Sequence, residues 1–350
     1  MQNEPLKTDF ARRLIAWQKA HGRNQLPWQG TRDPYRIWLS EVMLQQTQVA
    51  TVIPYYLRFL DRFPDIGSLA RATEEDVLTY WAGLGYYSRG RNLHQAARRI
   101  SQDHQGNFPQ DLSAIEALPG IGRSTAAAIA AFAFEQRRAI LDGNVKRVLA
   151  RVFGIEGWPG ERAVETRMWS LADELLPLTD IPAYTQGLMD LGATVCTRRQ
   201  ARCAMCPFTA DCHASRYGRQ DELPTSRPRR ALPLKSTAML ILLHDEQVLL
   251  EKRPGRGIWG GLWSLPECSA STSAHAAAMG LGYRALRIDE HDVVSHTFTH
   301  YRLAIHPWLI KVERRIVAEE PGRAWHPLRG LDNIAMPTPV LRLLKAIRID

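Results

Sequence analysis

Hydrophobic residues recur at helical spacing along the N-terminal part of the chain, from residue 10 to beyond residue 195. Runs of alternating β-branched residues are few there, and a period near 3.6 residues predicts amphipathic helices. The alanine-rich stretch 126–133 is the plainest example. We therefore expect this part of the chain to be all-α.

The pattern changes after the last of four clustered cysteines. Residues 223–235 contain three prolines and four basic residues but no acid, a composition typical of a linker. Beyond it, residues 237–243, 248–250 and 303–310 read as strands, and 339–347 as a closing helix. The pattern predicts a multidomain chain with an all-α domain (1–222), a linker (223–235) and an α+β domain (236–350).

Composition adds only weak constraints. A chain of 350 residues exceeds the size of most single cores, and its net charge of +9 hints at a polyanionic partner, although many basic proteins bind nothing acidic. Residues 1–12 lack the apolar core of a secretory signal, and no stretch approaches the ~20 apolar residues of a membrane span. We expect a soluble, cytoplasmic protein that does not associate with membranes.

Four of the five cysteines follow the spacing Cys196-x6-Cys203-x2-Cys206-x5-Cys212. Four thiolates in one short loop can surround a metal centre, and this spacing by itself leaves zinc open. Arginines 198, 199 and 202 within the loop either meet phosphates or are solvated surface charges. Cys268 stands apart and is expected to be a bystander thiol.

A second motif, Leu-Pro-Gly-Ile-Gly at 118–122, precedes Arg123, Ser124 and the alanine-rich helix. Glycines 120 and 122 would let backbone amides face a phosphate at the helix N-terminus, although such a motif is more often only a tight turn. About twenty residues later comes Asp142, in Asp-Gly-Asn-Val-Lys-Arg. Asp142 is either a site residue or the cap of a helix that begins near Asn144.

A third motif covers residues 38–49, Trp-Leu-Ser-Glu-Val-Met-Leu-Gln-Gln-Thr-Gln-Val. If it is helical, Glu41 shares a face with Ile37, Trp38 and Leu44. Burial among apolar groups raises the pKa of a carboxyl, as is needed to give a proton to a leaving base. The alternative is an amphipathic helix with one tolerated glutamate.

Taken together, these three motifs resemble the MutY family of adenine DNA glycosylases, in the helix-hairpin-helix (endonuclease III) superfamily. The resemblance covers essentially the whole chain. It implies an all-α helix-hairpin-helix glycosylase domain with an iron-sulfur cluster loop, a [4Fe-4S] cluster on the four cysteines, and double-stranded DNA with adenine opposite 8-oxoguanine or guanine as the substrate. The base must leave the stack before hydrolysis.

The resemblance also implies roles for single residues. Glu41 would protonate adenine at N7, Asp142 would stabilise the oxocarbenium-like sugar or bond to it transiently, and Asn144 would hold the acid and the attacking water. The other matched positions fall into an adenine pocket (Trp28, Leu44, Val49), the surroundings of the opposing guanine (Gln46, Thr47, Leu84), a wedge (Tyr86) and the DNA backbone contacts (Gly120, Gly122, Ser124, Lys146). Tyr87 is expected to be core packing.

One position separates neighbours within the superfamily. Members that also cut the strand carry a lysine in the first turn after the hairpin, where its amine attacks the sugar, whereas this chain has Ser124. We therefore expect a monofunctional enzyme, with any lyase activity through Lys146 incidental. The alternatives are a bifunctional endonuclease III-like glycosylase and AP lyase, and a non-enzymatic damage-binding protein.

The C-terminal domain resembles a Nudix fold through residues 259–266, Trp-Gly-Gly-Leu-Trp-Ser-Leu-Pro. Residues 269–280 contain no acid, so the magnesium-binding glutamates of a Nudix hydrolase are missing and we expect a reader of 8-oxoguanine. The residues that contact 8-oxoguanine would be Phe298, Thr299 and His300, with Thr299 where the family usually has serine. The alternative is that His296 and His300 are ordinary residues at a strand edge. We expect a monomer, with other repair proteins and a replication clamp as possible binding partners.

Overall fold

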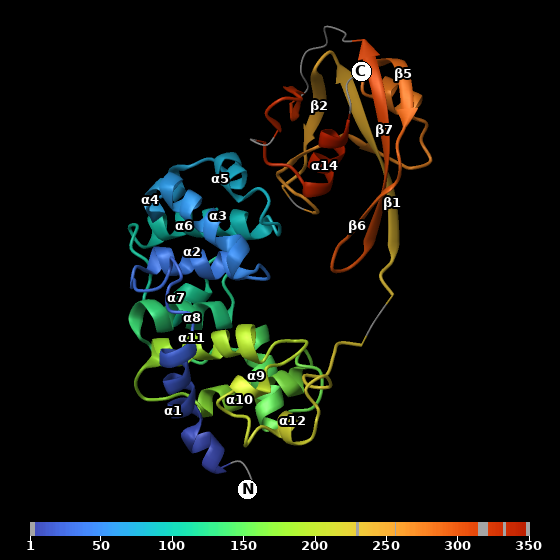
Figure 1. The fold of residues 1–350 in the computed structure, drawn as a ribbon. Helices are drawn as coiled ribbons and strands as arrows, with labels where there is room; N and C mark the ends of the chain where they lie inside the picture. Colours follow the sequence, from blue (N-terminus) through green and yellow to red (C-terminus); the bar gives the residue numbers. More distant parts are fainter. Residues whose placement is uncertain (1–3, 229–230, 256, 314–320, 332–333, 348–350) are drawn as a thin grey trace. The chain divides into compact units, whose positions relative to one another are not determined.

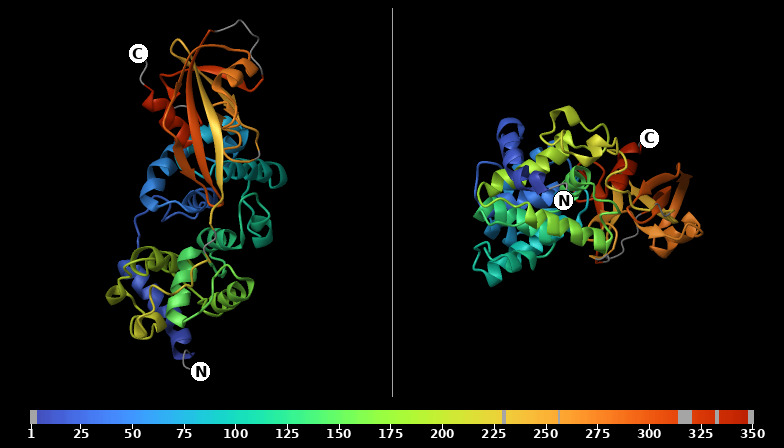
Figure 2. Two further views of the ribbon diagram at one scale, coloured as in Figure 1. Left: turned by 90° about the vertical axis from the view of Figure 1, so that its right-hand side faces the viewer. Right: turned by 90° about the horizontal axis from the view of Figure 1, so that it is seen from below.

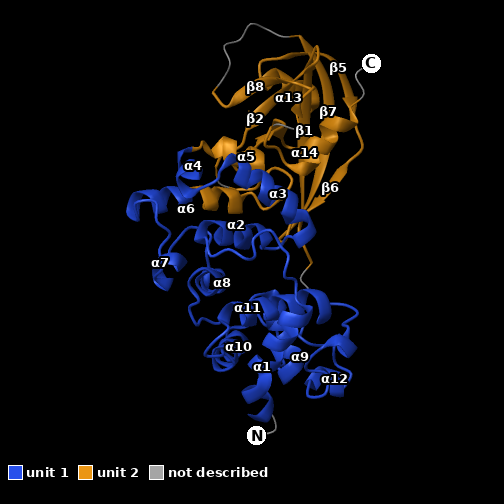
Figure 3. Ribbon diagram, turned by 60° about the vertical axis from the view of Figure 1, so that its left-hand side comes forward, with its two compact units in different colours: residues 1–71, 95–229 blue, residues 72–94, 230–350 orange. Residues whose placement is uncertain are grey.

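The computed structural model describes residues 4–228, 231–255, 257–313, 321–331 and 334–347, which form two compact units (Figure 3). Unit 1 comprises residues 1–71 and 95–229, and unit 2 comprises residues 72–94 and 230–350. Arg229 and Arg230 of the expected linker lie outside the described residues. Helices followed by a mixed sheet confirm the expected fold class of an all-α part joined to an α+β part.

Every regular element described in unit 1 is helical (Figure 1). These elements are α1 (Glu4–His21), α2 (Pro34–Leu44), α3 (Val49–Arg62), α4 (Ile66–Arg71), most of α6 (Ser88–Asp103), α7 (Leu112–Glu116), α8 (Arg123–Phe134), α9 (Gly143–Phe153), α10 (Arg162–Glu174), α11 (Ile181–Asp190), a π-helical turn η1 (Leu191–Val195), a 3-10 turn η2 (Cys203–Met205) and α12 (His213–Arg216). Among the described helices of the whole chain, none is long and apolar enough to cross a membrane.

The N-terminal helix is packed against the loop that carries the cysteines. Phe10 of α1 and Phe208 are both fully buried, and their rings stack with centroids 4.3 Å apart and planes 5° apart. Such a pair adds to the free energy gained from burying the two side chains. The cysteine loop is therefore held against the helical core before any cofactor is considered.

The expected helical segment at 38–49 is interrupted in the structure. Helix α2 ends at Leu44, and α3 begins at Val49. Between them Gln46 adopts a left-handed conformation with φ of 57°, and the amide of Thr47 donates to the carbonyl of Leu44 (3.2 Å). This turn leaves Glu41 in a helix but places the glutamine and threonine side chains on a loop.

Unit 2 holds a mixed eight-stranded sheet with the order β3-β2-β1-β7-β5, in which β4 pairs with β1, β6 with β7 and β8 with β2. The elements are α5 (Glu74–Trp81), β1 (Leu234–His244), β2 (Gln247–Lys252), β3 (Trp263–Ser264), β4 (Glu267–Cys268), α13 (Ala274–Gly280), β5 (Arg284–Glu290), β6 (Val294–Thr297), β7 (Arg302–Glu313), β8 (Arg323–Pro327) and α14 (Thr338–Ala346). Among the strands that the structure describes, only β1 and β7 pair in parallel, and they lie side by side along most of their length (Figure 1; Figure 2).

The central strand β1 is buried on both faces. Met239 and Ile241 belong to one core with Val340 of α14, while Leu240 belongs to another with Ala278 of α13. Because successive side chains of a strand point to opposite faces, the two helices cover opposite faces of the sheet. This explains why residues 237–243 read as an almost continuous apolar run.

Candidate active site and cysteine centre

Glu41 lies in the middle of α2, and its side chain is half-buried. On the same helix Ile37 and Trp38 are buried, as the sequence predicts for that face. This burial, and after it the negative charge of Asp142, raises the pKa of Glu41 to about 8. The carboxyl is therefore mostly protonated at neutral pH and can donate a proton.

Asp142 is the N-cap of α9. Its Oδ1 accepts a hydrogen bond from the amide of Val145 (2.8 Å), and its Oδ2 accepts one from Nδ2 of Asn144 (3.2 Å). Burial raises the pKa of Asp142, while the hydrogen bonds from Val145 and Asn144 act in the opposite direction. The capping role that the sequence left open is thus present, and it fixes the orientation of a buried carboxylate.

Glu41 and Asp142 line one cavity of about 850 Å³, which we call the catalytic cavity. Its size suits a small-molecule site. The other expected residues that line it are Leu44, Gln46, Thr47, Val49, Ser124 and Asn144. Trp28 instead lines a second cavity of about 600 Å³, which also borders Glu41. Glu41 therefore lies where the two cavities meet.

Arg23 also lines the catalytic cavity and was not expected from the sequence. Its amide and its Nε donate to the carboxylate of Asp190 at 2.8 and 2.6 Å, and Asp190 is fully buried. The two residues are 167 positions apart, so no local pattern could have paired them. This ion pair ties the segment after α1 to the end of α11.

Arg147 connects the catalytic cavity to the cysteine loop. Its Nη2 donates to Oδ1 of Asn144 (2.9 Å) and to the carbonyl of Gly192 (2.7 Å), and its Nε donates to the carbonyl of Cys196 (2.7 Å). A side chain on Gly192 would meet Asn144 at 2.5 Å, so only glycine allows this approach. Arg147 was not singled out from the sequence, although the motif around Asp142 contains it.

The four residues expected to contact the DNA backbone differ in their surroundings. Gly120 adopts a φ of 78° and Gly122 is the N-cap of α8, which leaves the first amides of that helix without a side-chain cap. The hydroxyl of Ser124 accepts from the amide of Leu141 (2.9 Å) at the rim of the catalytic cavity. Lys146 instead donates to Glu165 (2.6 Å) in an ion pair.

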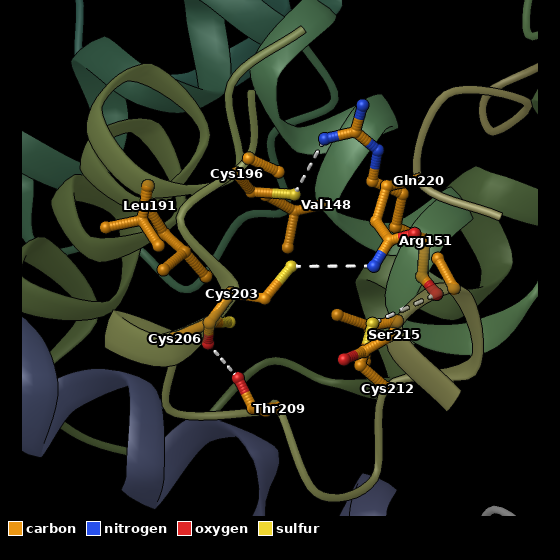
Figure 4. Close-up of a pocket in the computed structure, with 14 residues that line it drawn as sticks. Val148, Arg151, Leu191, Cys196, Cys203, Cys206, Thr209, Cys212, Ser215 and Gln220 are labelled. Atoms are coloured by element: carbon orange, nitrogen blue, oxygen red, sulfur yellow. Dashed lines mark hydrogen bonds between the residues drawn. The ribbon is translucent and has the colours of Figure 1, made fainter. Parts of the chain in front are cut away.

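The four clustered cysteines line one cavity with apolar walls that include Val148 and Leu191 (Figure 4). All four are free thiols. Burial raises the pKa of Cys206 to about 12, and it also raises that of Cys212. Within the described parts of the chain, no three His, Cys, Asp or Glu side chains meet closely enough to hold a single metal ion.

Donors from outside the loop face two of these sulfurs (Figure 4). Nη1 of Arg151 lies 3.4 Å from Sγ of Cys196, and Nε2 of Gln220 lies 3.8 Å from Sγ of Cys203. Arg151 is only 3% exposed and also donates to the carbonyls of Thr197, Arg198 and Leu223. A buried cation beside the thiols compensates for negative charge on them.

In unit 2, Phe298, Thr299 and His300 line a third cavity together with Tyr86. The ring of Phe298 is 4.9 Å from that of Tyr301, and Oγ1 of Thr299 lies 3.4 Å from Nδ1 of His300. Thr299 and His300 are exposed. Helix α13 contains no acidic residue, as the sequence indicates.

The glycine-bounded tip after α5 separates its two tyrosines. Tyr86 is 48% exposed and adopts a φ of 49°, whereas Tyr87 is buried and donates from its hydroxyl to the carbonyl of Met336 (2.9 Å). Leu84, expected near the opposing guanine, is buried as well. The exposed aromatic at the tip is therefore Tyr86.

Two family models match the chain. The model of the HhH-GPD superfamily base excision DNA repair proteins matches residues 39–174, and that of the NUDIX domain matches residues 237–346. The adenine DNA glycosylase of Buchnera aphidicola (Acyrthosiphon pisum) is 34% identical over 96% of this chain and 97% of its own. The adenine DNA glycosylase of Homo sapiens is 31% identical over 97% of this chain and 74% of its own.

Solved structures agree for the helical part. A thermostable thymine-DNA glycosylase superposes with a TM-score of 0.56 at 27% identity, covering 62% of this chain and all of that one. A trapped endonuclease III–DNA covalent intermediate gives a TM-score of 0.52 at 19% identity, covering 61% of this chain and 98% of that one. The second likeness shows a shared fold.

Proposed function

Since the chain belongs to the family of adenine DNA glycosylases, we propose that Glu41 and Asp142 hydrolyse the N-glycosidic bond of adenine mispaired with 8-oxoguanine or guanine. The enzyme is a monofunctional DNA N-glycosylase of base excision repair. One observation supports the assignment most strongly. Glu41 and Asp142 come from separate helices, yet they line the same cavity and the charge of one raises the pKa of the other.

Glu41 is the general acid. Its carboxyl keeps its proton at neutral pH because it is buried, and it gives that proton to N7 of the extruded adenine as the bond to the sugar breaks. The electrons of that bond remain with the base, which leaves as neutral adenine. Leu44 and Val49 supply apolar walls for the base, and Trp28 borders the acid from the second cavity.

Asp142 stabilises the positive charge that develops on the sugar, either as a carboxylate nearby or through a transient bond to C1′. The hydrogen bond that its carboxylate accepts from the amide of Val145 fixes the orientation of the carboxylate, and the side-chain amide of Asn144 also donates to it. Arg147 in turn holds the amide oxygen of Asn144, so the amide cannot flip without losing that bond. Water then completes the hydrolysis and leaves an abasic site.

The strand remains uncut because a hydroxyl stands where a lyase needs an amine. Ser124 cannot form a Schiff base with the sugar, and its oxygen is already an acceptor for the amide of Leu141. Lys146 is held by Glu165. Borohydride trapping as efficient as that of a true lyase would favour the bifunctional alternative.

We further propose that Cys196, Cys203, Cys206 and Cys212 hold a [4Fe-4S] cluster. The apolar walls around the four cysteines and the donors from Arg151 and Gln220 support thiolate ligation of such a cluster. When bound, the cluster supplies four iron–thiolate bonds that fix the loop next to Arg147. Iron and acid-labile sulfide in roughly equal amounts would support this proposal, and zinc without sulfide would refute it.

The function is tested by base release under single-turnover conditions. Duplexes with adenine opposite 8-oxoguanine, guanine or thymine are incubated with excess enzyme, and free adenine is quantified. We expect adenine release to be fastest opposite 8-oxoguanine, slower opposite guanine and slowest opposite thymine. Strand breaks should appear only after treatment with alkali. Intact adenine in all three duplexes after prolonged incubation would refute the proposal.

A further inference from the structure

Trp259 adopts a backbone conformation that large side chains rarely take. Its φ is 55°, between Gly257 at 95° and Gly261 at 75°. The left-handed region costs free energy for any residue with a Cβ, and most for bulky ones. A strained residue of this kind persists only where its surroundings enforce it, and it often marks a functional position.

The strain is enforced by Arg253. Its amide donates to the carbonyl of Leu262 (2.9 Å) and its Nε donates to the carbonyl of Ile258 (3.1 Å), which closes the turn 257–262 on both sides. The guanidinium pairs with Glu267 and lies 5.9 Å from the Trp259 ring. Turn 257–262 is therefore held to the residue that follows β2, and through it to Glu267 of β4.

The Trp259 ring packs against segment 296–300, which we call the reader loop. Its centroid lies 5.7 Å from that of His296 and 5.4 Å from that of Phe298, and these two rings are 4.6 Å from each other. All three side chains are partly buried, whereas Thr299 and His300 at the tip of the loop are exposed. The three rings and both tip residues line the same cavity.

We propose that Trp259 is a positioning residue for mispair specificity. Its ring supports one side of Phe298 and His296, so that the exposed tip of the reader loop meets the opposing base in one orientation. In this strained conformation the indole packs against the reader loop. The inference rests on the proposed function of the reader loop in distinguishing 8-oxoguanine from guanine.

The test compares Trp259→Asn and Trp259→Phe with wild type. Asparagine tolerates a left-handed backbone, so Trp259→Asn keeps the turn and removes the ring. The measured quantity is the ratio of single-turnover rates for adenine opposite 8-oxoguanine and opposite guanine. We expect this ratio to fall by about three- to tenfold in Trp259→Asn and by less in Trp259→Phe.

Trp325→Phe is the matched control. Trp325 packs on the opposite face of the sheet, where its ring is 5.5 Å from that of Tyr283. Trp325→Phe removes the same atoms as Trp259→Phe but at a site away from the reader loop. Its ratio of rates for the two mispairs should therefore equal that of wild type. An equal fall in Trp325→Phe would show general destabilisation and overturn the inference.

A double-mutant cycle keeps the inference testable if Trp259→Asn does not fold. Trp259→Phe and Phe298→Ala should be non-additive, because both act through the same loop. Additive effects would overturn the inference, as would a wild-type ratio in Trp259→Asn. If the wild type itself does not discriminate between the two mispairs, the proposed function of the reader loop fails instead.

Discussion

Glu41 carries an ionisable carboxyl that loses much of its contact with water when the chain folds, so its protonation is coupled to folding. Its pKa is about 8 in the folded chain, against 4.5 for an ordinary glutamate. Between these values the folded state keeps the proton and the unfolded state loses it. The stabilisation that the protonated form provides is complete below about pH 4.5, and it is lost as the pH rises through about 8.

We therefore expect Glu41→Gln, which cannot ionise, to unfold at a higher temperature than wild type at pH 8 by a few degrees. The difference should shrink towards pH 4.5. Thermal unfolding followed by circular dichroism at several pH values measures it. Glu116→Gln, at an exposed position on α7, is the control. A difference that did not depend on pH would contradict the assigned pKa.

The residues that carry the chemistry differ in how visible they are in the sequence. Glu41 and Asp142 belong to contiguous motifs, so the sequence alone marks them as candidates, and the resemblance to a family suggests their roles. Arg23 could not be identified in this way, because its position depends on Asp190, 167 residues away, through a pair that only the folded chain creates. The left-handed backbone of Trp259 could not be predicted either, because a tryptophan in the sequence gives no sign of that conformation.

Helix α9 links the fold to the proposed chemistry, because its N-cap, Asp142, is also a proposed catalytic residue. Asp142→Asn should keep the hydrogen bond to the amide of Val145 but lose the charge that stabilises the sugar. We expect it to abolish adenine release while changing the unfolding free energy little. Asp142→Ala should abolish release and also lower the unfolding free energy by about 1 kcal/mol.

Urea unfolding and single-turnover assays of both variants separate the two roles. If Asp142→Asn released adenine at the wild-type rate, Asp142 would be a cap and no more. Equal stabilities for the two variants would instead show that the cap bond contributes little.

At the scale of elements, long periodic segments were predictable and short ones were not. The helical nature of unit 1 and strands β1, β2 and β7 follow from hydrophobic periodicity. Strands β3 and β4 contain two residues each, too few to show a hydrophobic period. They form because β3 pairs with β2 and β4 pairs with β1. The turn at Gln46 was missed because a glutamine in a left-handed conformation carries no glycine signal.

At the scale of the whole molecule, the net charge of +9 favours duplex DNA of any sequence. Each phosphate contact releases counterions, so the logarithm of the binding constant should fall linearly with the logarithm of salt concentration. Arg198 lines the catalytic cavity. Arg198→Gln should reduce the magnitude of the slope of this log–log plot by about one.

Fluorescence anisotropy with an undamaged duplex over a potassium chloride series gives this slope. The control is Arg12→Gln, because Arg12 is an exposed arginine of α1 that pairs with Asp9. An identical slope in Arg198→Gln and wild type would mean that Arg198 meets no phosphate.

The pH dependence of adenine release shows whether Glu41 is the general acid. Single-turnover rates for a duplex with adenine opposite 8-oxoguanine are measured from about pH 5 to about pH 10 for wild type and Glu41→Gln. Because the general acid must be protonated, the wild-type rate should fall about tenfold per unit above a pKa near 8, and Glu41→Gln should release no adenine at any pH. A wild-type rate that stays level to about pH 10, or a Glu41→Gln variant as fast as wild type, would show that Glu41 is not the general acid.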